Sequence, residues 1–432
     1  MNPQTTHLIA ADKSRLWHPF TQMKAWTDPT HQPLVIVDGE GALVRDSEGR
    51  EYIDGNSSIW TNIHGHRHPV ITQAIKDQLD KVAHVSFLGS TNAPAIELAE
   101  RLVALLPDSH LTRVFYSDDG STAVEVALKM ALQYWQLTDR PHRNQFLSFA
   151  NAYHGDTAGA ASLGGLGTFF DRFGAIHFKS HHVTDLAALE ALPKEVTSRL
   201  AAVIIEPKVQ GAAGIQLWPE GMLIKLRAWC DRVGALLIFD EVLTGFGRTG
   251  RMFACEHESV APDFLCLAKG LTGGYLPLAA TLTTERIYEA FLGEFSELKT
   301  FFYGHSYCGN ALGCSAALAS LQIFENEHVL ENLSGKISCL GELLTGLSSL
   351  PQVAEVRQCG FIAGVELQKS PGVPCDWRDQ TGARACVAAR KHGLLTRPIL
   401  DTIALIPPLC ISKDQLSSAV HALESAIKDT TI

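Results

Sequence analysis

The sequence predicts an α/β fold, with a large domain built on a mostly parallel sheet and a smaller α+β domain. Between about residues 68 and 323, apolar runs of strand length alternate with helix-length segments, which is typical of a parallel sheet with crossover helices. Short strands and turns precede this region, and a mixed pattern follows it. We therefore expect the small domain to combine residues 1–65 and 321–432, and the large domain to span residues 66–320.

The first predicted element is an antiparallel hairpin region from Leu34 to Asp54, where apolar and polar residues alternate around Asp-Gly and Glu-Gly turns. A helix, PVITQAIKDQLDKVAH, is expected after His68. Ser121 or Thr122 is expected to cap the helix TAVEVALKMALQYWQ. The strands expected in the large sheet are RVFYS, FLSFA, AAVIIEP, ALLIFDE, DFLCLA and PLAATLT.

The C-terminal third begins with a helix rich in small residues, ALGCSAALASLQIFE, from Ala311. Two strands are then expected, near Val353–Arg357 and Phe361–Leu367. No repeat or long linker separates the two parts of the chain, so we expect them to pack closely. Their junction is the expected place for an active site.

Composition excludes several classes of protein. The chain of 432 residues has 36 Lys and Arg against 46 Asp and Glu, a net charge of -10 that argues against a nucleic-acid partner. Its apolar runs, such as Leu200–Ile205, are too short to span a bilayer. The first residues lack the pattern of a signal peptide, and the 10 cysteines form no CxxC pair. We expect a cytoplasmic protein without a membrane partner.

Two strand ends carry candidate catalytic groups. In GALLIFDEVLTGFGRTG, a buried strand delivers Asp240 to the edge where open α/β sheets bind ligands. This carboxylate could bind a metal or a ribose, pair with a protonated heterocycle, or only cap structure. In LCLAKGLTGGYLPLAAT, Lys269 follows another apolar strand. If Lys269 is buried, its neutral amine is favoured and can form a Schiff base with an aldehyde. The alternative interpretation is an ordinary surface lysine.

A third candidate is the strand-to-helix turn at Gly120 and Ser121, where free N–H groups and the helix dipole favour a phosphate. Alone, such a turn is usually only a helix cap. Together, the phosphate cradle, Asp240 and Lys269 match the needs of pyridoxal 5'-phosphate (PLP): anion binding, ring protonation and a covalent lysine. The combination predicts a PLP enzyme with no metal site.

The sequence resembles the class III (ω-) aminotransferases of PLP fold type I essentially from end to end. The resemblance is carried by DEVLTGFGRTG, AKGLTGGYLPLAA and YHGDT, the last at Tyr153–Thr157. It implies a large domain with a seven-stranded sheet covered by helices on both faces, and a homodimer with shared active sites. The segments LWHPFTQM, SSIWTNIHGH, FYGHSYCGN and LLTRP are most similar to the family members that convert 8-amino-7-oxononanoate to 7,8-diaminononanoate in biotin synthesis.

The resemblance implies a role for individual residues. Lys269 holds the cofactor and moves protons, Asp240 pairs with the pyridine nitrogen, and Tyr153 stacks on the ring and faces substrate. The implied cofactor ligands are Gly120, Ser121, Tyr153, Asp240, Lys269, His305 and Ser306, the last two reaching across from a second subunit. The implied substrate contacts are Phe20, Trp60, Tyr153, Lys269, Gly304 and Arg397, with Arg397 pairing with a carboxylate.

Two positions depart from the family pattern. Phe20 lacks the hydroxyl of the tyrosine found in some members, and Asp119 replaces a frequent serine beside the expected phosphate. Asp156 and Glu206 are expected to support the site from behind the residues that touch the cofactor. The amino donor stays open between S-adenosylmethionine and lysine.

Three rival hypotheses remain beside this one. The nearest is another class III transaminase, acting on ω-amino acids or diamines. A dinucleotide-binding module is less compatible, because the chain lacks an early G-x-G-x-x-G turn. In a remote alternative, His64 and His66 would hold the metal of a hydrolase.

Overall fold

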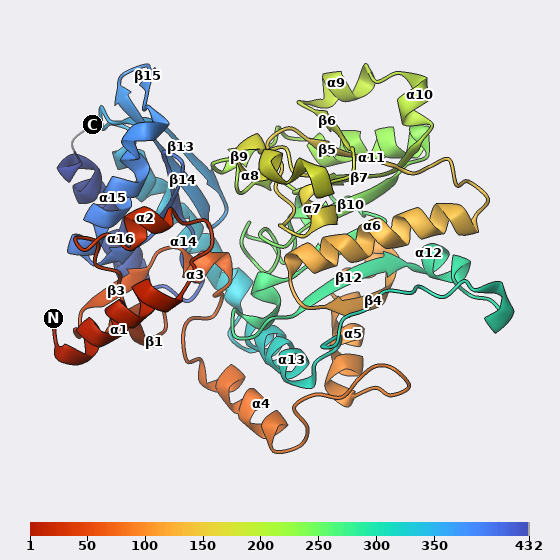
Figure 1. Ribbon diagram of the computed structural model, residues 1–432, viewed down its shortest axis with the longest axis horizontal. Coiled ribbons are helices and arrows are strands. Elements are labelled where there is room, and N and C mark those ends of the chain that lie inside the picture. Colours follow the sequence, from red (N-terminus) through yellow and green to blue (C-terminus); the bar gives the residue numbers. More distant parts are fainter. Residues whose placement is uncertain (431–432) are drawn as a thin grey trace.

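The computed structural model describes residues 1–430, and Figure 1 shows the large sheet on one side and both chain ends on the other. The large sheet has seven strands in the order β4-β12-β11-β10-β7-β5-β6. Their bounds are Leu111–Ser117 (β4), Ala279–Thr284 (β12), Phe264–Leu267 (β11), Leu236–Asp240 (β10), Leu200–Ile205 (β7), Gln145–Phe149 (β5) and His181–Val183 (β6). Strand β12 runs antiparallel to both neighbours, and the other pairs are parallel. The predicted mostly parallel sheet is confirmed.

Helices cover both faces of this sheet because its strands are apolar on both sides. Ala202 and Ile204 of β7 face helix α6 (Gly120–Leu137). Val203 and Ile205 face the opposite way, into a core shared with α5 (Ala93–Ala104) and α11 (Met222–Val233). The alternation along one strand therefore builds two apolar layers, and the sheet edge between them stays available for ligands.

The remaining elements of the large part are mostly short. Its other helices are α4 (Pro69–Leu79), α7 (Ala158–Ala161), α8 (Gly167–Phe170), α9 (Leu186–Glu190), α10 (Lys194–Thr197), α12 (Glu285–Ala290) and α13 (Ala311–Asn326). A small ribbon pairs β8 (Val209–Gln210) with β9 (Gln216–Leu217). Helix α13 packs against α4 and α5.

Both chain ends build the smaller part, seen in Figure 1 as red and blue elements lying together. One sheet joins β1 (Ile36–Glu40), β2 (Leu43–Asp46), β3 (Glu51–Asp54) and β16 (Leu394–Leu395); the other contains β13 (Val353–Cys359), β14 (Ile362–Ser370), β18 (Thr402–Leu405) and β17 (Arg397–Ile399), with β15 (Val373–Pro374) beside β14. The helices are α1 (Pro3–Arg15), α2 (Met23–Trp26), α3 (Ser57–Trp60), α14 (Val329–Leu347), α15 (Thr381–Ala389) and α16 (Lys413–Asp429). Strand β16 pairs with β3, which joins the two ends in one sheet. The domain boundaries stay a prediction; the one at residue 320 falls within α13.

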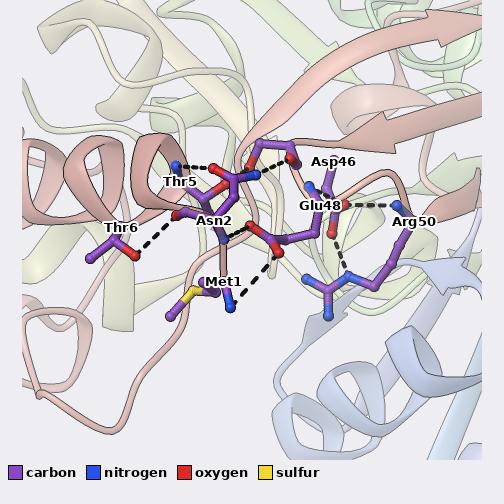
Figure 2. A network of polar contacts seen from close by, with 8 residues as sticks. Met1, Asn2, Thr5, Thr6, Asp46, Glu48 and Arg50 are labelled. Atoms are coloured by element: carbon purple, nitrogen blue, oxygen red, sulfur yellow. Dashed lines mark hydrogen bonds and ion pairs between the residues drawn. The ribbon is translucent and has the colours of Figure 1, made fainter.

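Helix α1 is fastened to the turn between β2 and β3 (Figure 2). The side chain of Asn2 caps the helix by accepting a hydrogen bond from the N–H of Thr5 at 2.8 Å. The Asn2 N–H donates to Glu48 at 2.9 Å. Within the turn, buried Asp46 accepts hydrogen bonds from the backbone and side chain of Arg50. The first helix is thus held by polar contacts at its start.

The structure corrects one predicted cap and adds one strand. Helix α6 begins at Gly120 with Asp119 as its N-cap, so Ser121 and Thr122 lie in the first turn instead of capping it. Strand β6 was not among the expected strands, because its three residues carry two histidines and no apolar run. Within residues 1–430, no helix has both the length and the apolar character that crossing a bilayer requires.

Candidate active site

A cavity of about 470 Å³ opens beside the carboxyl ends of β7, β10 and β11, where the ends of parallel strands leave a crevice. Among the residues that line it are Trp60, Gly120, Ser121, Tyr153, Glu206, Asp240 and Lys269. These side chains come from six separate segments of the chain. The structure therefore brings together the strand-end carboxylate, the strand-end lysine and the helix start that the sequence indicated.

Lys269 follows β11 and presents its amine to the cavity. Burial lowers the pKa of this amine, while the negative charges of Asp240 and Glu206 oppose that effect. Within residues 1–430 the amine has no hydrogen-bond acceptor; its nitrogen lies 5.0 Å from the centre of the Trp60 ring. A lysine with a lowered pKa and no ion-pair partner is suited to react with a carbonyl group.

Asp240, the last residue of β10, is held by two contacts. Its Oδ2 atom lies 2.7 Å from Nδ1 of His154, and Oδ1 accepts a hydrogen bond from the N–H of Val242 at 3.1 Å. His154 is fully buried, and its Nε2 atom has no partner within the described residues. His154 is a residue of the site that the sequence did not single out, although it follows Tyr153 directly in YHGDT, a segment that carries the family resemblance.

Glu206 lies at the end of β7 and holds the loop that carries Tyr153. Its carboxylate accepts hydrogen bonds from the N–H of Tyr153 at 3.3 Å and of Gly211 at 2.9 Å. Burial raises the pKa of Glu206 to about 7. Its hydrogen bonds go to backbone N–H groups, so Glu206 fixes this loop, and its side chain also lines the cavity.

The start of α6 offers free donors to the cavity. Asp119 accepts a hydrogen bond from the N–H of Thr122 at 2.9 Å, so its carboxylate caps the helix. The N–H groups of Gly120 and Ser121 precede the first intrahelical bond and are left for an anion. The Ser121 hydroxyl accepts from the N–H of Asp156 at 3.1 Å. Asp119, which stands where many family members have serine, therefore forms a capping box with Thr122.

The hydroxyl of Tyr153 donates to Oδ2 of Asp156 at 2.6 Å, and burial raises the pKa of Tyr153. Gly155 lies between them with φ of +122°, and a Cβ there would approach the Ser121 hydroxyl to 2.2 Å. Only glycine fits this close approach. Tyr153 is thus fixed at both its backbone and its hydroxyl, with the ring left along the cavity wall.

Arg397 begins β17 in the small part and is half-buried. Within residues 1–430 it forms no ion pair, and burial lowers the pKa of its guanidinium. The nearby hydroxyl of Tyr153 partly opposes this lowering of the pKa. A guanidinium without an ion-pair partner near Tyr153 is suited to bind a carboxylate.

Phe20 is exposed, and its ring meets Phe169 edge-on at 5.5 Å; Phe169 in turn contacts the Tyr153 ring at 6.3 Å.

Gly304, His305 and Ser306 do not line the cavity of their own chain. His305 lies at its margin, where Nδ1 is 2.7 Å from a carboxylate oxygen of Asp118. The same ring contacts the Tyr303 hydroxyl at 2.8 Å. Within one chain, this segment is therefore placed beside the site and not in it.

His64 and His66 do not converge. His66 Nε2 lies 3.0 Å from Oδ2 of Asp54, and His64 Nε2 lies 3.0 Å from the hydroxyl of Ser320. Burial lowers the pKa of His64 to about 3. Across the described part of the chain, no three His, Cys, Asp or Glu side chains are grouped so that they could hold a metal ion.

The residues around the cavity fit PLP. The helix start supplies donors for a phosphate, buried Asp240 supplies an acceptor for a protonated ring nitrogen, and Lys269 supplies an unpaired amine. Tyr153 lines the same cavity as these groups. The site thus has the parts of a PLP-dependent transferase.

Comparison with known proteins agrees with this geometry. Residues 24–427 match the family described as aminotransferase class-III, and the chain belongs to this family. Its members are PLP-dependent enzymes. A relative from Geobacter sulfurreducens, named adenosylmethionine-8-amino-7-oxononanoate aminotransferase, is 46% identical, with 97% of each chain covered.

Two solved structures are also similar. An aminotransferase of the same name from Methanocaldococcus jannaschii superposes with a TM-score of 0.96 at 43% identity, covering 99% of this chain and 100% of the other. An amine transaminase from an uncultivated Pseudomonas species, solved in its PLP-bound form, gives a TM-score of 0.90 at 35% identity, covering 96% and 99%. Both the predicted fold class and the predicted family are confirmed.

Proposed function

We propose that this protein transfers an amino group to 8-amino-7-oxononanoate and forms 7,8-diaminononanoate, with PLP as cofactor. The observation that carries the proposal is similarity: relatives up to 46% identical over nearly the whole chain bear the name of this activity. The unpaired Arg397 supports it, because the acceptor carries a carboxylate that a guanidinium can bind in a bidentate way.

Each residue of the chain then has a defined task. PLP, when bound, supplies an electron sink that stabilises negative charge at the substrate carbon. The amine of Lys269 would hold the cofactor and would move a proton to and from the reacting carbon of the substrate. Asp240, backed by His154, holds a proton at the ring nitrogen. The N–H groups of Gly120 and Ser121 bind the phosphate.

The substrate side is formed by other residues. Arg397 binds the substrate carboxylate and thereby sets how far the reacting carbon of the substrate enters the cavity. Tyr153 and Trp60 provide walls that exclude water, and the bond from Tyr153 to Asp156 fixes the direction of the phenol. Phe20 extends this wall through Phe169. Although the net charge of the chain is -10, the substrate carboxylate and the phosphate meet positive local groups, namely the guanidinium of Arg397 and the N–H groups at the start of α6.

We also propose that two copies of the chain share their active sites, with Gly304, His305 and Ser306 completing the site of the partner. The segment that holds them does not line its own cavity. It also exposes large apolar side chains: Phe302 is 78% exposed and Tyr307 61%. Such exposure in a folded chain favours a contact with another protein surface. A cytoplasmic location stays a prediction.

The direct test mixes the purified protein, loaded with PLP, with 8-amino-7-oxononanoate and either S-adenosylmethionine or lysine. We expect 7,8-diaminononanoate with at least one donor, and the comparison of donors decides which one the enzyme uses. A Lys269→Ala protein is the control. No product with either donor, but transamination of a simple diamine, would replace this proposal with that of a general ω-transaminase.

A further inference from the structure

Four consecutive residues, Ser57 to Trp60, form a left-handed turn. Their φ angles are 47°, 51°, 80° and 71°, and none of them is glycine. Residues with side chains enter this region singly and at a cost, because Cβ approaches the following carbonyl group. Ile59 is branched at Cβ, which makes the conformation especially unfavourable for it. Contacts outside the turn must therefore hold it in place.

Asp54, the last residue of β3, supplies the main contact. One of its carboxylate oxygens accepts a hydrogen bond from the N–H of Ser58 at 2.9 Å, and the other accepts from the Ser58 hydroxyl at 2.8 Å. The second oxygen also contacts Nε2 of His66 at 3.0 Å. Asp54 is only 5% exposed, so these bonds are protected from water. Both of its oxygens are used to fix the turn.

The two ends of the turn are fastened as well. The Ser57 hydroxyl donates to the carbonyl of Ile406 at 2.7 Å, and the Trp60 indole N–H donates to Asn56 at 2.9 Å. From the large part of the chain, the buried guanidinium of Arg248 donates to the carbonyl of Trp60 at 3.4 Å. The indole therefore has a fixed position and a fixed tilt.

That position is chemically significant, because the centre of the Trp60 ring lies 5.0 Å from the amine nitrogen of Lys269. An aromatic face at this distance stabilises the ammonium form, whereas burial disfavours it. The same ring forms a wall of the cavity. If the Trp60 ring moved toward or away from Lys269, both the protonation of the amine and the width of the cavity would change.

We propose that Asp54 is a positioning residue, which locks the left-handed turn Ser57–Trp60 and so holds the Trp60 ring over the reactive amine of Lys269. The proposal rests on the proposed function only in taking Lys269 as the reactive group. Asp54 touches neither the cavity nor Lys269, and acts through Ser58 and the turn.

The test is Asp54→Asn, since an asparagine keeps the volume but cannot accept all the hydrogen bonds of the carboxylate. With PLP bound, we expect kcat/KM to fall about 10- to 100-fold, the cost of misplacing a group in the site. In the cofactor-free full chain, we expect the rate at which an amine-specific reagent labels Lys269, measured by mass spectrometry, to shift toward that of Trp60→Ala. Asp46→Asn is the matched control: it removes another buried carboxylate of the small part, and should leave labelling unchanged.

A second substitution separates positioning from folding. Glycine enters the left-handed region readily, so adding Ile59→Gly to Asp54→Asn lowers the cost of the turn. We expect it to restore most of the lost kcat/KM and the wild-type labelling rate. If Asp54→Asn does not fold, Ser58→Ala replaces it, because it removes one of the two bonds.

Two results would overturn the proposal: wild-type labelling in the Asp54 or Ser58 variant, or a folded variant that Ile59→Gly fails to restore. The labelling experiment does not depend on turnover. If the wild-type protein forms no 7,8-diaminononanoate, the proposed function fails, and labelling still decides whether Asp54 positions Trp60.

Discussion

Nδ1 of His154 lies 2.7 Å from Oδ2 of Asp240, and both side chains are closed off from solvent. The short contact means that the imidazole N–H donates to the carboxylate. Asp240 is therefore oriented by a partner from a different segment, the loop after β5. A strand-end carboxylate alone could turn; this one is held toward the cavity.

We predict that His154→Leu lowers kcat about 10- to 100-fold, the cost of losing a hydrogen bond to a charged group. His154→Asn should retain more activity than His154→Leu, because its amide can still donate to Asp240. The measurement is single-turnover kinetics with bound PLP. A structural role alone would show as equal losses in both variants, tracking their thermal stability.

This pair also shows how far sequence reasoning reaches. Asp240 and Lys269 could be predicted, because each follows an apolar strand and parallel strands end at one edge. His154 could not be ranked above other histidines, because its partner is 86 residues away in the chain. The left-handed turn at Ser57–Trp60 has no local signal either, since nothing in SSIW favours positive φ. The sequence favoured Ser121 or Thr122 as the cap of α6, and only the geometry shows that Asp119 caps this helix instead.

Glu206 makes stability depend on pH. Burial raises its pKa from 4.5 to about 7, so the folded protein binds more protons than the unfolded chain between these values. The free energy of unfolding should therefore fall as pH rises through this window, by up to about 3 kcal/mol from this group. Urea unfolding of the cofactor-free protein at pH 5 and pH 8 should show this fall. In Glu206→Gln the fall should be smaller, and an unchanged profile would argue against a buried acid at this position.

Lys269 should show the opposite pH trend. Burial lowers the pKa of its amine below 10.5, so the unfolded chain binds more protons and stability rises with pH up to that value. Lys269→Met should lower turnover by about 10³-fold or more, and should make the cofactor-free protein more stable at pH 7, because methionine, unlike an amine, gives up no strong hydration when it is buried. Thermal unfolding measures the second effect. A less stable Lys269→Met protein would mean that the amine has a favourable partner when folded.

Arg397 should discriminate substrates by their carboxylate. Arg397→Ala removes the unpaired guanidinium, and we expect KM for 8-amino-7-oxononanoate to rise about 10- to 100-fold with a smaller change in kcat. Arg397→Lys should recover only part of this, because an ammonium cannot bind a carboxylate in a bidentate way. An acceptor ketone without a carboxylate is the control, and its KM should hardly change. Equal losses for both acceptors would place Arg397 outside substrate binding.

Sharing of active sites predicts complementation between two inactive chains. Ser306→Asp should abolish activity by placing a negative charge beside the phosphate, and Lys269→Ala removes the amine. If Ser306 serves the partner, a mixed dimer contains one site with Lys269 and Ser306 both intact. Equal co-expression should then give about a quarter of wild-type activity, because half of randomly formed dimers are mixed and one of their two sites works. Activity no higher than that of each variant alone would show that Ser306 serves its own chain or that the protein works as a monomer, and sedimentation of the wild-type protein separates these two outcomes.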